Sequence, residues 1–327
     1  MAAWILLATA GQFVNAIVAF LDKYIVSDET ALPKPFIYAF YSCLLTGGWI
    51  VIYLSGFVPG LSTLGVPHLA NVHTPSIQVV AMAFLSAYTF FMALVSMYSA
   101  LRSAEAVNVM PVIGVISAIS SLGMVYLFLD VVLEPNFIWG IVVLSLGTLL
   151  VAQTLPHIDT VIHVIHSGVF FALHFITMKG LFQETSFDDG FFWSRICFVL
   201  FALSLLLVPT YYKKIREQTG LTTKKTGALV LVTKILAGVG AFMILKATDM
   251  GDVAVVQALD GVKFVFILLI TIFFGALLPD SAVEHVTKPS EVMRRVLYVL
   301  VIAAGYFILF GSVDYLYLFT QVYAPIT

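Results

Sequence analysis

A short stretch within an apolar region of the chain carries three side chains that could do chemistry. Gln257, Asp260 and Lys263 occur at intervals of three between Val255 and Phe264. On a helix they would lie within an arc of about 120°, and a carboxylate and an ammonium three residues apart can neutralise each other. A charge at the centre of a membrane span costs about 2.5–3.5 kcal/mol, so it usually faces the protein interior. The stretch is either a structural ion pair or a cavity-lining group whose partner can be exchanged for substrate or a proton.

Histidine and asparagine residues also fall inside apolar runs. His174 lies deepest in its run, and because histidine titrates near neutral pH it is a candidate proton relay. His163 and His166 lie near the start of the same run, where interfacial solvation explains them. The candidate substrate or coupling-ion site comprises six residues, in which each asparagine has the alternative of bonding a neighbouring helix: Asp260, Lys263, Gln257, His174, Asn108 and Asn15.

Other reactive side chains have simpler interpretations. Arg195 and Lys234 lie near the ends of their apolar runs, so we expect them to extend toward the membrane interface. Cys43 and Cys197 fall inside apolar runs, where a thiol behaves as a small hydrophobe. The sequence contains none of the nucleophile, zinc or nucleotide motifs Gly-x-Ser-x-Gly, His-Glu-x-x-His and Gly-x-x-x-x-Gly-Lys-Ser/Thr. We therefore expect no enzyme activity, no metal and no cofactor.

The composition indicates that these residues lie in a membrane protein. Hydrophobic residues make up 61% of the 327 residues and charged residues 10%, whereas soluble chains are about 25% charged. The mean hydropathy is +1.04. The apolar runs do not alternate as barrel strands would, so the predicted fold class is an all-α polytopic membrane protein. A formal charge of −2 provides no basic field for nucleic acid.

The positions of the apolar runs predict ten transmembrane helices, since a span needs about 20 residues. They fall near residues 3–23, 35–57, 77–100, 105–128, 136–154, 161–182, 191–212, 227–247, 252–276 and 295–312. The longest polar connection is 212–225. Lys and Arg concentrate in the odd-numbered connections, and basic loops stay cytoplasmic. We expect a multi-pass protein of the cell membrane (plasma or inner membrane) with both termini outside the cytoplasm.

The two halves of the chain show a weak internal repeat. An offset of 147 residues places Ala104 to Val115 on Gly251 to Val262, and Glu105 on Asp252. Both acidic residues would open a long span, where a helix N-terminus favours negative charge. Because five spans is an odd number, the halves would be inverted repeats. The predicted units are residues 1–156, residues 157–312 and an aromatic interfacial tail at residues 313–327.

The segments Ala-Leu-Arg-Ser-Ala-Glu-Ala-Val-Asn-Val-Met-Pro111 and Gly251-Asp-Val-Ala-Val-Val-Gln-Ala-Leu-Asp-Gly261 resemble the EamA branch of the drug/metabolite transporter superfamily. The likeness covers roughly residues 3–312. It implies a ten-helix carrier whose central cavity is lined mainly by spans one, three, four, six, eight and nine, with spans five and ten more peripheral. Asp130 and Val131 stand where the family often has a Gly-Glu pair, and many members have cytoplasmic termini.

These patterns predict a secondary transporter, driven by gradients or exchange, that moves a small polar or amphipathic metabolite by alternating access. Its expected partners are a small-molecule substrate, protons as a candidate coupling ion, and the lipid bilayer, with the chain acting as a monomer or homodimer. One alternative is a non-transporting scaffold or lipid-flipping subunit. Another is an intramembrane enzyme, which would need a paired nucleophile and base at depth.

Overall fold

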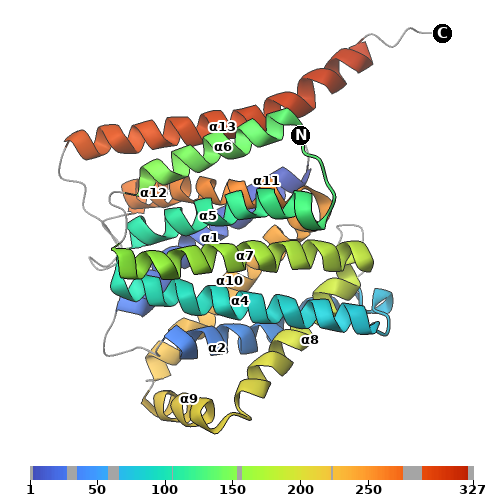
Figure 1. The fold of residues 1–327 in the computed structure, drawn as a ribbon, viewed down its shortest axis with the longest axis vertical. Helices are drawn as coiled ribbons and strands as arrows, with labels where there is room; N and C mark the ends of the chain where they lie inside the picture. Colours follow the sequence, from blue (N-terminus) through green and yellow to red (C-terminus); the bar gives the residue numbers. More distant parts are fainter. Residues whose placement is uncertain are drawn as a thin grey trace.

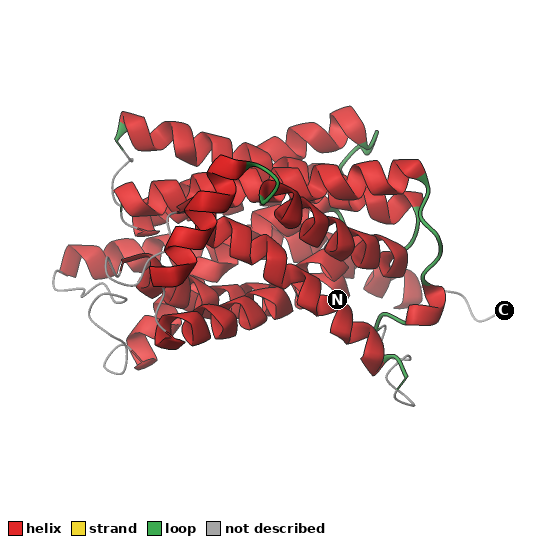
Figure 2. Cartoon of the chain, turned by 90° about the horizontal axis from the view of Figure 1, so that it is seen from below, coloured by secondary structure: helices red, strands yellow, loops and turns green. Residues whose placement is uncertain are grey.

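The computed structural model describes residues 3–27, 35–57, 66–104, 106–152, 157–221, 224–274 and 289–322. This part of the chain folds into helices and contains no strand (Figure 2). In lipid every backbone amide and carbonyl must find a partner within the protein, and a helix satisfies this within one segment. The apolar, non-alternating runs therefore become long helices, as the sequence predicts.

The described chain contains the following elements in order: α1 (Ala3–Ser27), α2 (Pro35–Thr46), η1 (Gly47–Val51), α3 (Ile52–Ser55), η3 (Leu69–Asn71), α4 (Ile77–Ser103), α5 (Ala106–Phe128), α6 (Pro135–Val151), α7 (Ile158–Glu184), α8 (Phe187–Leu205), α9 (Pro209–Leu221), α10 (Lys224–Met250), α11 (Val253–Ala258), η4 (Leu259–Gly261), α12 (Val262–Phe274) and α13 (Pro289–Val322). Here η marks a short 3-10 helix.

Local sequence signals determine where several helices begin. Ser76 and Ser186 cap α4 and α8 by accepting hydrogen bonds from the backbone amides of Val79 and Asp189. Asp252 caps α11 by accepting from two backbone amides at 2.8 and 3.1 Å, which confirms that an acidic residue opens this helix. Side-chain oxygens at these positions satisfy amides that have no partner within the helix. Glu105, its counterpart in the predicted repeat, lies outside the described residues.

Seven stretches of the described chain are long and apolar enough to cross a membrane. They are Ala3–Asp22, Pro35–Leu54, Ile77–Ser103, Asn108–Phe128, Ile158–Glu184, Thr226–Met250 and Val253–Ile270. An eighth is added if α8 and the start of α9, which meet at an angle of 96°, form one broken span. Helix α6 is apolar but has only 17 residues. The protein is therefore an all-α polytopic membrane protein, and the predicted total of ten spans stays a prediction.

The long helices stack side by side, with α6 and α13 at one edge of the bundle and α9 at the opposite edge (Figure 1). The extensive helix pairs are α4 with α7, α1 with α10, and α6 with α13.

Glycines permit the close approach of α6 and α13. A Cβ atom on Gly147 would lie 2.8 Å from the backbone nitrogen of Ile302, and one on Gly305 would lie 2.7 Å from that of Leu144. Small residues at such crossings allow dense packing between membrane helices.

Three details differ from the sequence analysis. The polar connection predicted at 212–225 is largely helical, because α9 continues to Leu221. The helix that contains the last predicted span continues beyond 312, since α13 runs on to Val322 through part of the predicted tail. The span predicted at 252–276 is interrupted by η4, a 3-10 turn at Leu259–Gly261. A 3-10 turn within a helix often marks a functional hinge, and this one contains Asp260.

Candidate functional site

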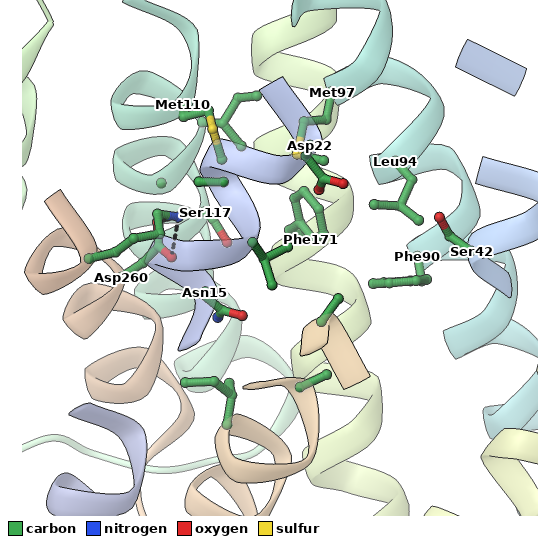
Figure 3. Close-up of a pocket in the computed structure, with 18 of the residues that line it drawn as sticks. Asn15, Asp22, Ser42, Phe90, Leu94, Met97, Met110, Ser117, Phe171 and Asp260 are labelled. Atoms are coloured by element: carbon green, nitrogen blue, oxygen red, sulfur yellow. Dashed lines mark hydrogen bonds and ion pairs between the residues drawn. The ribbon is translucent and has the colours of Figure 1, made fainter. Parts of the chain in front are cut away.

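A cavity of about 240 Å³ lies among the helices in the middle of the bundle. Its walls come from α1, α2, α4, α5, α7, α8, α10 and the α11–η4–α12 run, while the described parts of α6 and α13 contribute none of them. In the view of Figure 3, Asp260 and Ser117 lie on one side of the cavity and Phe90 and Ser42 lie on the other. The cavity therefore brings together helices from both ends of the sequence.

One part of the cavity wall is apolar and rich in aromatic and sulfur-containing side chains. Helices α4, α5 and α7 supply the following residues: Phe90, Leu94, Met97, Met110, Ile113, Phe171 and Phe175. Such a surface would contact the apolar body of a ligand, and methionine adapts its shape to what it contacts. Ligand sites typically combine an apolar lining with a few placed polar groups, and the remaining wall of this cavity has those groups.

The first charged group on the wall is an ion pair between two helices far apart in sequence. Lys234 Nζ on α10 lies 3.2 Å from Asp22 Oδ1 on α1. The hydroxyl of Tyr38 also donates to Asp22, and Lys234 donates to the hydroxyl of Tyr98 at 3.0 Å. The ammonium lies 3.9 Å from the centre of the Tyr38 ring, a distance typical of cation–π attraction. The side chains of Lys234 and Asp22 are 8% and 13% exposed, so both charges depend on protein partners.

The second charged group is the pair that the sequence singles out. Lys263 Nζ lies 2.8 and 2.9 Å from the two carboxylate oxygens of Asp260. Asp260 is the more exposed partner, with 23% of its side chain accessible compared with 9% for Lys263. Helix α5 leaves room for the carboxylate at Gly114, where an added Cβ would lie 2.7 Å from Asp260 Oδ2. The pair thus projects into the cavity from a helix break, with a glycine of the neighbouring helix against it.

Neutral polar groups connect this pair to other helices. Gln257 is 6% exposed, and its Oε1 accepts a hydrogen bond from Ser117 Oγ of α5 at 3.1 Å. Asn15 Nδ2 donates to Gln12 Oε1 on the same helix, at 3.4 Å. Both Asn15 and Gln257 line the cavity. Four of the six candidate residues, Asp260, Lys263, Gln257 and Asn15, are therefore brought together around one space.

The other two candidates, His174 and Asn108, lie elsewhere. His174 is 3% exposed and packs between α7 and α4. Its Nδ1 lies 2.9 Å from Ser86 Oγ and its ring lies 4.9 Å from that of Phe90. Asn108 is buried in the first turn of α5. Neither residue is part of the described cavity wall, so the structure does not bring them together with the other four. Packing against another helix determines the environment of His174.

Two cations that the sequence analysis places near the membrane interface are inside the protein instead. Lys234 forms the ion pair described above, and Arg195 is 5% exposed and lines the cavity. The expectation that they extend to the interface is wrong. Helix α8 begins at Phe187 rather than near 191, which moves Arg195 deeper, by about one helical turn. Asp22 is not among the six candidate residues because it immediately precedes Lys23. Two adjacent charges at the end of an apolar run usually indicate the membrane interface.

The side chain of Arg195 is held by neighbours on its own helix. Its guanidinium carbon lies 4.7 Å and 4.8 Å from the ring centres of Phe191 and Phe198. Its Nε and Nη2 approach Ser194 Oγ at 3.4 and 3.3 Å, which are long hydrogen bonds. No carboxylate of the described chain lies within ion-pair distance of this guanidinium. Arg195 therefore differs from the two lysines of the cavity, each of which has a carboxylate partner.

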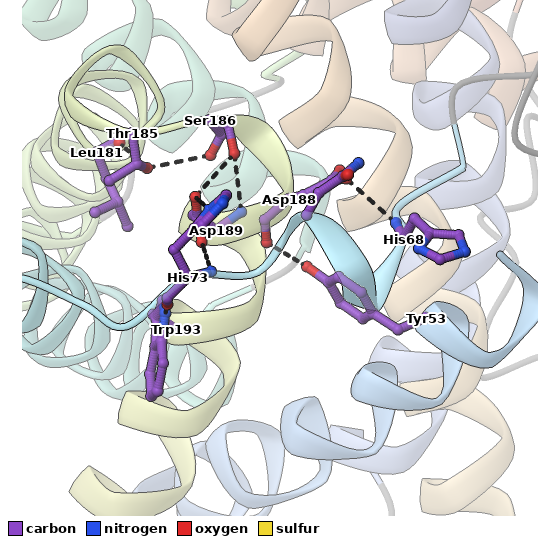
Figure 4. A network of polar contacts seen from close by, with 10 residues as sticks. Tyr53, His68, His73, Leu181, Thr185, Ser186, Asp188, Asp189 and Trp193 are labelled. Atoms are coloured by element: carbon purple, nitrogen blue, oxygen red, sulfur yellow. Dashed lines mark hydrogen bonds and ion pairs between the residues drawn. The ribbon is translucent and has the colours of Figure 1, made fainter.

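A second polar network joins the segment before α4 to the start of α8 (Figure 4). Asp188 accepts from the side chain of Asn71 at 2.7 Å and from the backbone amide of His68 at 3.2 Å. Asp189 accepts from the backbone amide of His73 at 2.6 Å, and the indole of Trp193 donates to the carbonyl of His73 at 2.9 Å. Side-chain carboxylates thus fasten this segment to one end of the helix that carries Arg195.

The end of α10 is bound in a related way by Lys179 of α7. Its ammonium donates to the backbone carbonyls of Thr248, Asp249 and Gly251, each at 2.9 Å. The last carbonyls of a helix have no partner within the helix, and a cation nearby satisfies them.

In the described part of the chain, no group of three or more His, Cys, Asp or Glu side chains is arranged to hold a metal ion.

Comparisons with known proteins bear on the fold alone. No family model matches the sequence, and no curated protein matches it significantly. A solved structure described only as "Crystal structure of protein" matches over 92% of this chain and 95% of that chain, with a TM-score of 0.59 and 15% sequence identity. Most of the chain therefore has a counterpart with a similar arrangement of helices. The protein belongs to the class of all-α polytopic membrane proteins, and its resemblance to the EamA branch stays a prediction.

Proposed function

We propose that this protein is a secondary transporter that moves a small amphipathic metabolite across a membrane by alternating access. The observation that carries the proposal is the cavity within the bundle, which is lined by helices from both predicted halves of the chain. Its wall combines an aromatic surface with charged side chains, as the site of an amphipathic solute requires. The absence of a nucleotide-binding motif in the sequence favours movement driven by gradients or exchange.

The helix pairing supports two inverted five-helix repeats. If α1 and α7 occupy equivalent places in the two halves, then α4 is equivalent to α10. The pairs α4 with α7 and α10 with α1 are then the same contact seen twice, and both are among the most extensive in the bundle. The pair α6 with α13 would join the two fifth spans. The beginning of α1 and the end of α13 lie toward the same side of the bundle (Figure 1), as ten crossings require.

Three further features support alternating access. The ion pair between Asp22 and Lys234 joins α1 of one proposed half to α10 of the other, so relative movement of the halves would break it. The 3-10 turn η4 places Asp260 at an interruption of its helix, and carriers typically bind solutes at such breaks. The network formed by Asp188 and Asp189 would close one end of the pathway. By the distribution of Lys and Arg, that end faces outside the cytoplasm together with both termini.

The test is solute counterflow into liposomes that contain the purified protein. A broad panel of metabolites is loaded inside, and uptake of each labelled solute is measured against empty liposomes and against the Asp260→Asn/Lys263→Gln variant. We expect saturable counterflow of at least one amphipathic solute by the wild-type protein and none by the variant. Absence of flux for the whole panel, without any response to pH or membrane voltage, would contradict the proposal and favour a scaffold.

Accessibility labelling tests the alternating mechanism separately. Cys43 and Cys197 are 0% and 2% exposed, so the native thiols give little background reaction. A single cysteine introduced at Thr46 in the cavity wall is treated with a membrane-impermeant thiol reagent from each side of sealed vesicles. We expect the transported solute to change the ratio of labelling from the two sides. Equal labelling from both sides under all conditions would indicate a channel instead.

A further inference from the structure

The cavity wall contains more positive than negative charge. Among the described lining residues, the carboxylates are Asp22 and Asp260, and the cations are Lys234, Lys263 and Arg195. Each carboxylate is paired with a lysine, at 3.2 Å in one case and 2.8 Å in the other. The two pairs neutralise themselves, so the guanidinium of Arg195 is the charge left over. The described cavity wall therefore has a surplus of one positive charge.

The environment of Arg195 is suited to binding an anion. A guanidinium has five N–H donors, and within the described residues Ser194 Oγ is its hydrogen-bond acceptor, at 3.3 Å or more. The rings of Phe191 and Phe198 hold the group in place without accepting ordinary hydrogen bonds. A buried charge without a counter-ion is costly, and a fork of N–H groups matches the two oxygens of a carboxylate.

The other properties of the cavity limit the charge, the chemical character and the size of the ligand. One surplus positive charge is balanced by a single negative charge. The aromatic and methionine side chains supplied by α4, α5 and α7 would contact an apolar body attached to that charge. A volume of about 240 Å³ is below the roughly 300–1,000 Å³ of pockets for drug-sized ligands, so the ligand is small.

From these observations we propose that the solute is a small organic monoanion, a carboxylate on an aromatic or bulky apolar body, and that Arg195 binds its carboxylate. This inference rests on the proposed transport function and specifies its substrate class. The neutral Asp22–Lys234 and Asp260–Lys263 pairs remain intact in the bound state, and the surplus charge of Arg195 selects anions over neutral and cationic solutes of the same shape.

Three probes that share one body test the charge preference directly. Phenylacetate is an anion, phenylacetamide is its neutral counterpart, and phenethylammonium is a cation. Binding of each to the purified full-length protein in detergent micelles is measured at equilibrium by displacement of labelled phenylacetate and by thermal stabilisation. We expect saturable phenylacetate binding at millimolar or lower concentration, at least about tenfold tighter than binding of the other two probes.

The variant Arg195→Gln removes the guanidinium, and Arg102→Gln is its matched control because Arg102 is exposed at the end of α4. We expect Arg195→Gln to abolish the preference for the anion and Arg102→Gln to retain it. Arg195→Lys keeps the charge without the planar fork and should bind phenylacetate with intermediate affinity. If Arg195→Gln does not fold, the preference of the wild-type protein among the three probes and the Arg195→Lys variant still test the assignment.

Three results would overturn this inference. They are equal affinity of the wild-type protein for the three probes, absence of saturable phenylacetate binding at millimolar concentration, or survival of the anion preference in Arg195→Gln. Counterflow measured in parallel separates this inference from the transport function. Arg195-dependent binding without flux would support the anion site and contradict transport. Flux of neutral or cationic solutes without an anion preference would support transport and contradict the anion site.

Discussion

The two ion pairs of the cavity contain the same chemical groups but are built differently. Lys234 and Asp22 come from helices α10 and α1 and are separated by 212 residues, whereas Lys263 and Asp260 are three residues apart on one helix run. The first pair is supported by two tyrosines. The second faces the cavity beside Gly114 of α5.

This difference assigns the pairs different mechanical roles. An ion pair between two helices forms only in one relative position of those helices. It therefore stabilises one relative position of the proposed halves. A pair within one helix moves with that helix and persists when the halves move. We therefore expect the Asp22–Lys234 pair to control stability and the change of conformation, and the Asp260–Lys263 pair to shape the solute site.

The largest expected effect comes from breaking the pair between helices. Asp22→Asn leaves the ammonium of Lys234, whose side chain is 8% exposed, without a carboxylate. Removing one member of a buried ion pair typically costs about 3–5 kcal/mol. We expect a loss of that size in the free energy of unfolding, measured by thermal or denaturant unfolding in detergent. The double variant Asp22→Asn/Lys234→Gln should recover most of it, and a coupling energy near zero in this double-mutant cycle would contradict the assigned role.

Breaking the pair within one helix should cost less. Asp260→Asn strands Lys263, but Asp260 is 23% exposed, so water in the cavity can solvate part of the remaining charge. We expect a loss of about 1.5–3 kcal/mol in unfolding free energy, the usual worth of hydrogen bonds to charged groups. Asp260→Asn/Lys263→Gln should restore folding while solute counterflow stays absent. Full transport activity in the double variant would show that the pair is only structural.

A glycine on the neighbouring helix allows the second pair to be displaced without changing its charges. An alanine at Gly114 would bring its Cβ within 2.7 Å of Asp260 Oδ2, whereas an alanine at Gly123 on the same helix meets nothing within 4 Å. We expect Gly114→Ala to lower the unfolding free energy by about 1 kcal/mol, at the lower end for overpacking. Gly123→Ala should be neutral or slightly stabilising, because alanine favours helix. Equal effects of the two substitutions would contradict the close contact.

The smallest expected effect concerns the hydrogen bond that joins α5 to α11. Ser117→Ala removes the donor to Gln257 Oε1 at 3.1 Å and should cost about 1 kcal/mol of unfolding free energy. The control is Ser121→Ala, one turn further along α5, because the buried hydroxyl of Ser121 has no hydrogen-bond partner in the described chain. We expect this control to be neutral or stabilising. A larger loss for Ser121→Ala than for Ser117→Ala would contradict the hydrogen-bond assignment.

Part of the candidate site could be predicted because it depends on one helix. Gln257, Asp260 and Lys263 recur every three residues, so the period of a helix predicts that they share a face, and in the structure all three line the cavity. The period of a helix does not decide what His174 contacts. Its position on α7 identifies the depth of the side chain, but whether that face meets a cavity or Ser86 of α4 depends on a helix that lies 88 residues away in sequence.

The sequence by itself determined that this is a helical membrane protein, roughly where its helices lie, and that Asp260 and Lys263 would form a pair. These features follow from apolar composition and from the geometry of a single helix. Only the tertiary structure decided that Asp22 meets Lys234 and that Arg195 faces the cavity without a carboxylate partner in the described chain. The reason is that contacts between helices depend on the shapes of the surfaces at each crossing. Asn15, for example, fits against Gly240 of α10, where any added Cβ would collide with Asn15 Oδ1, and no local sequence pattern encodes such a fit.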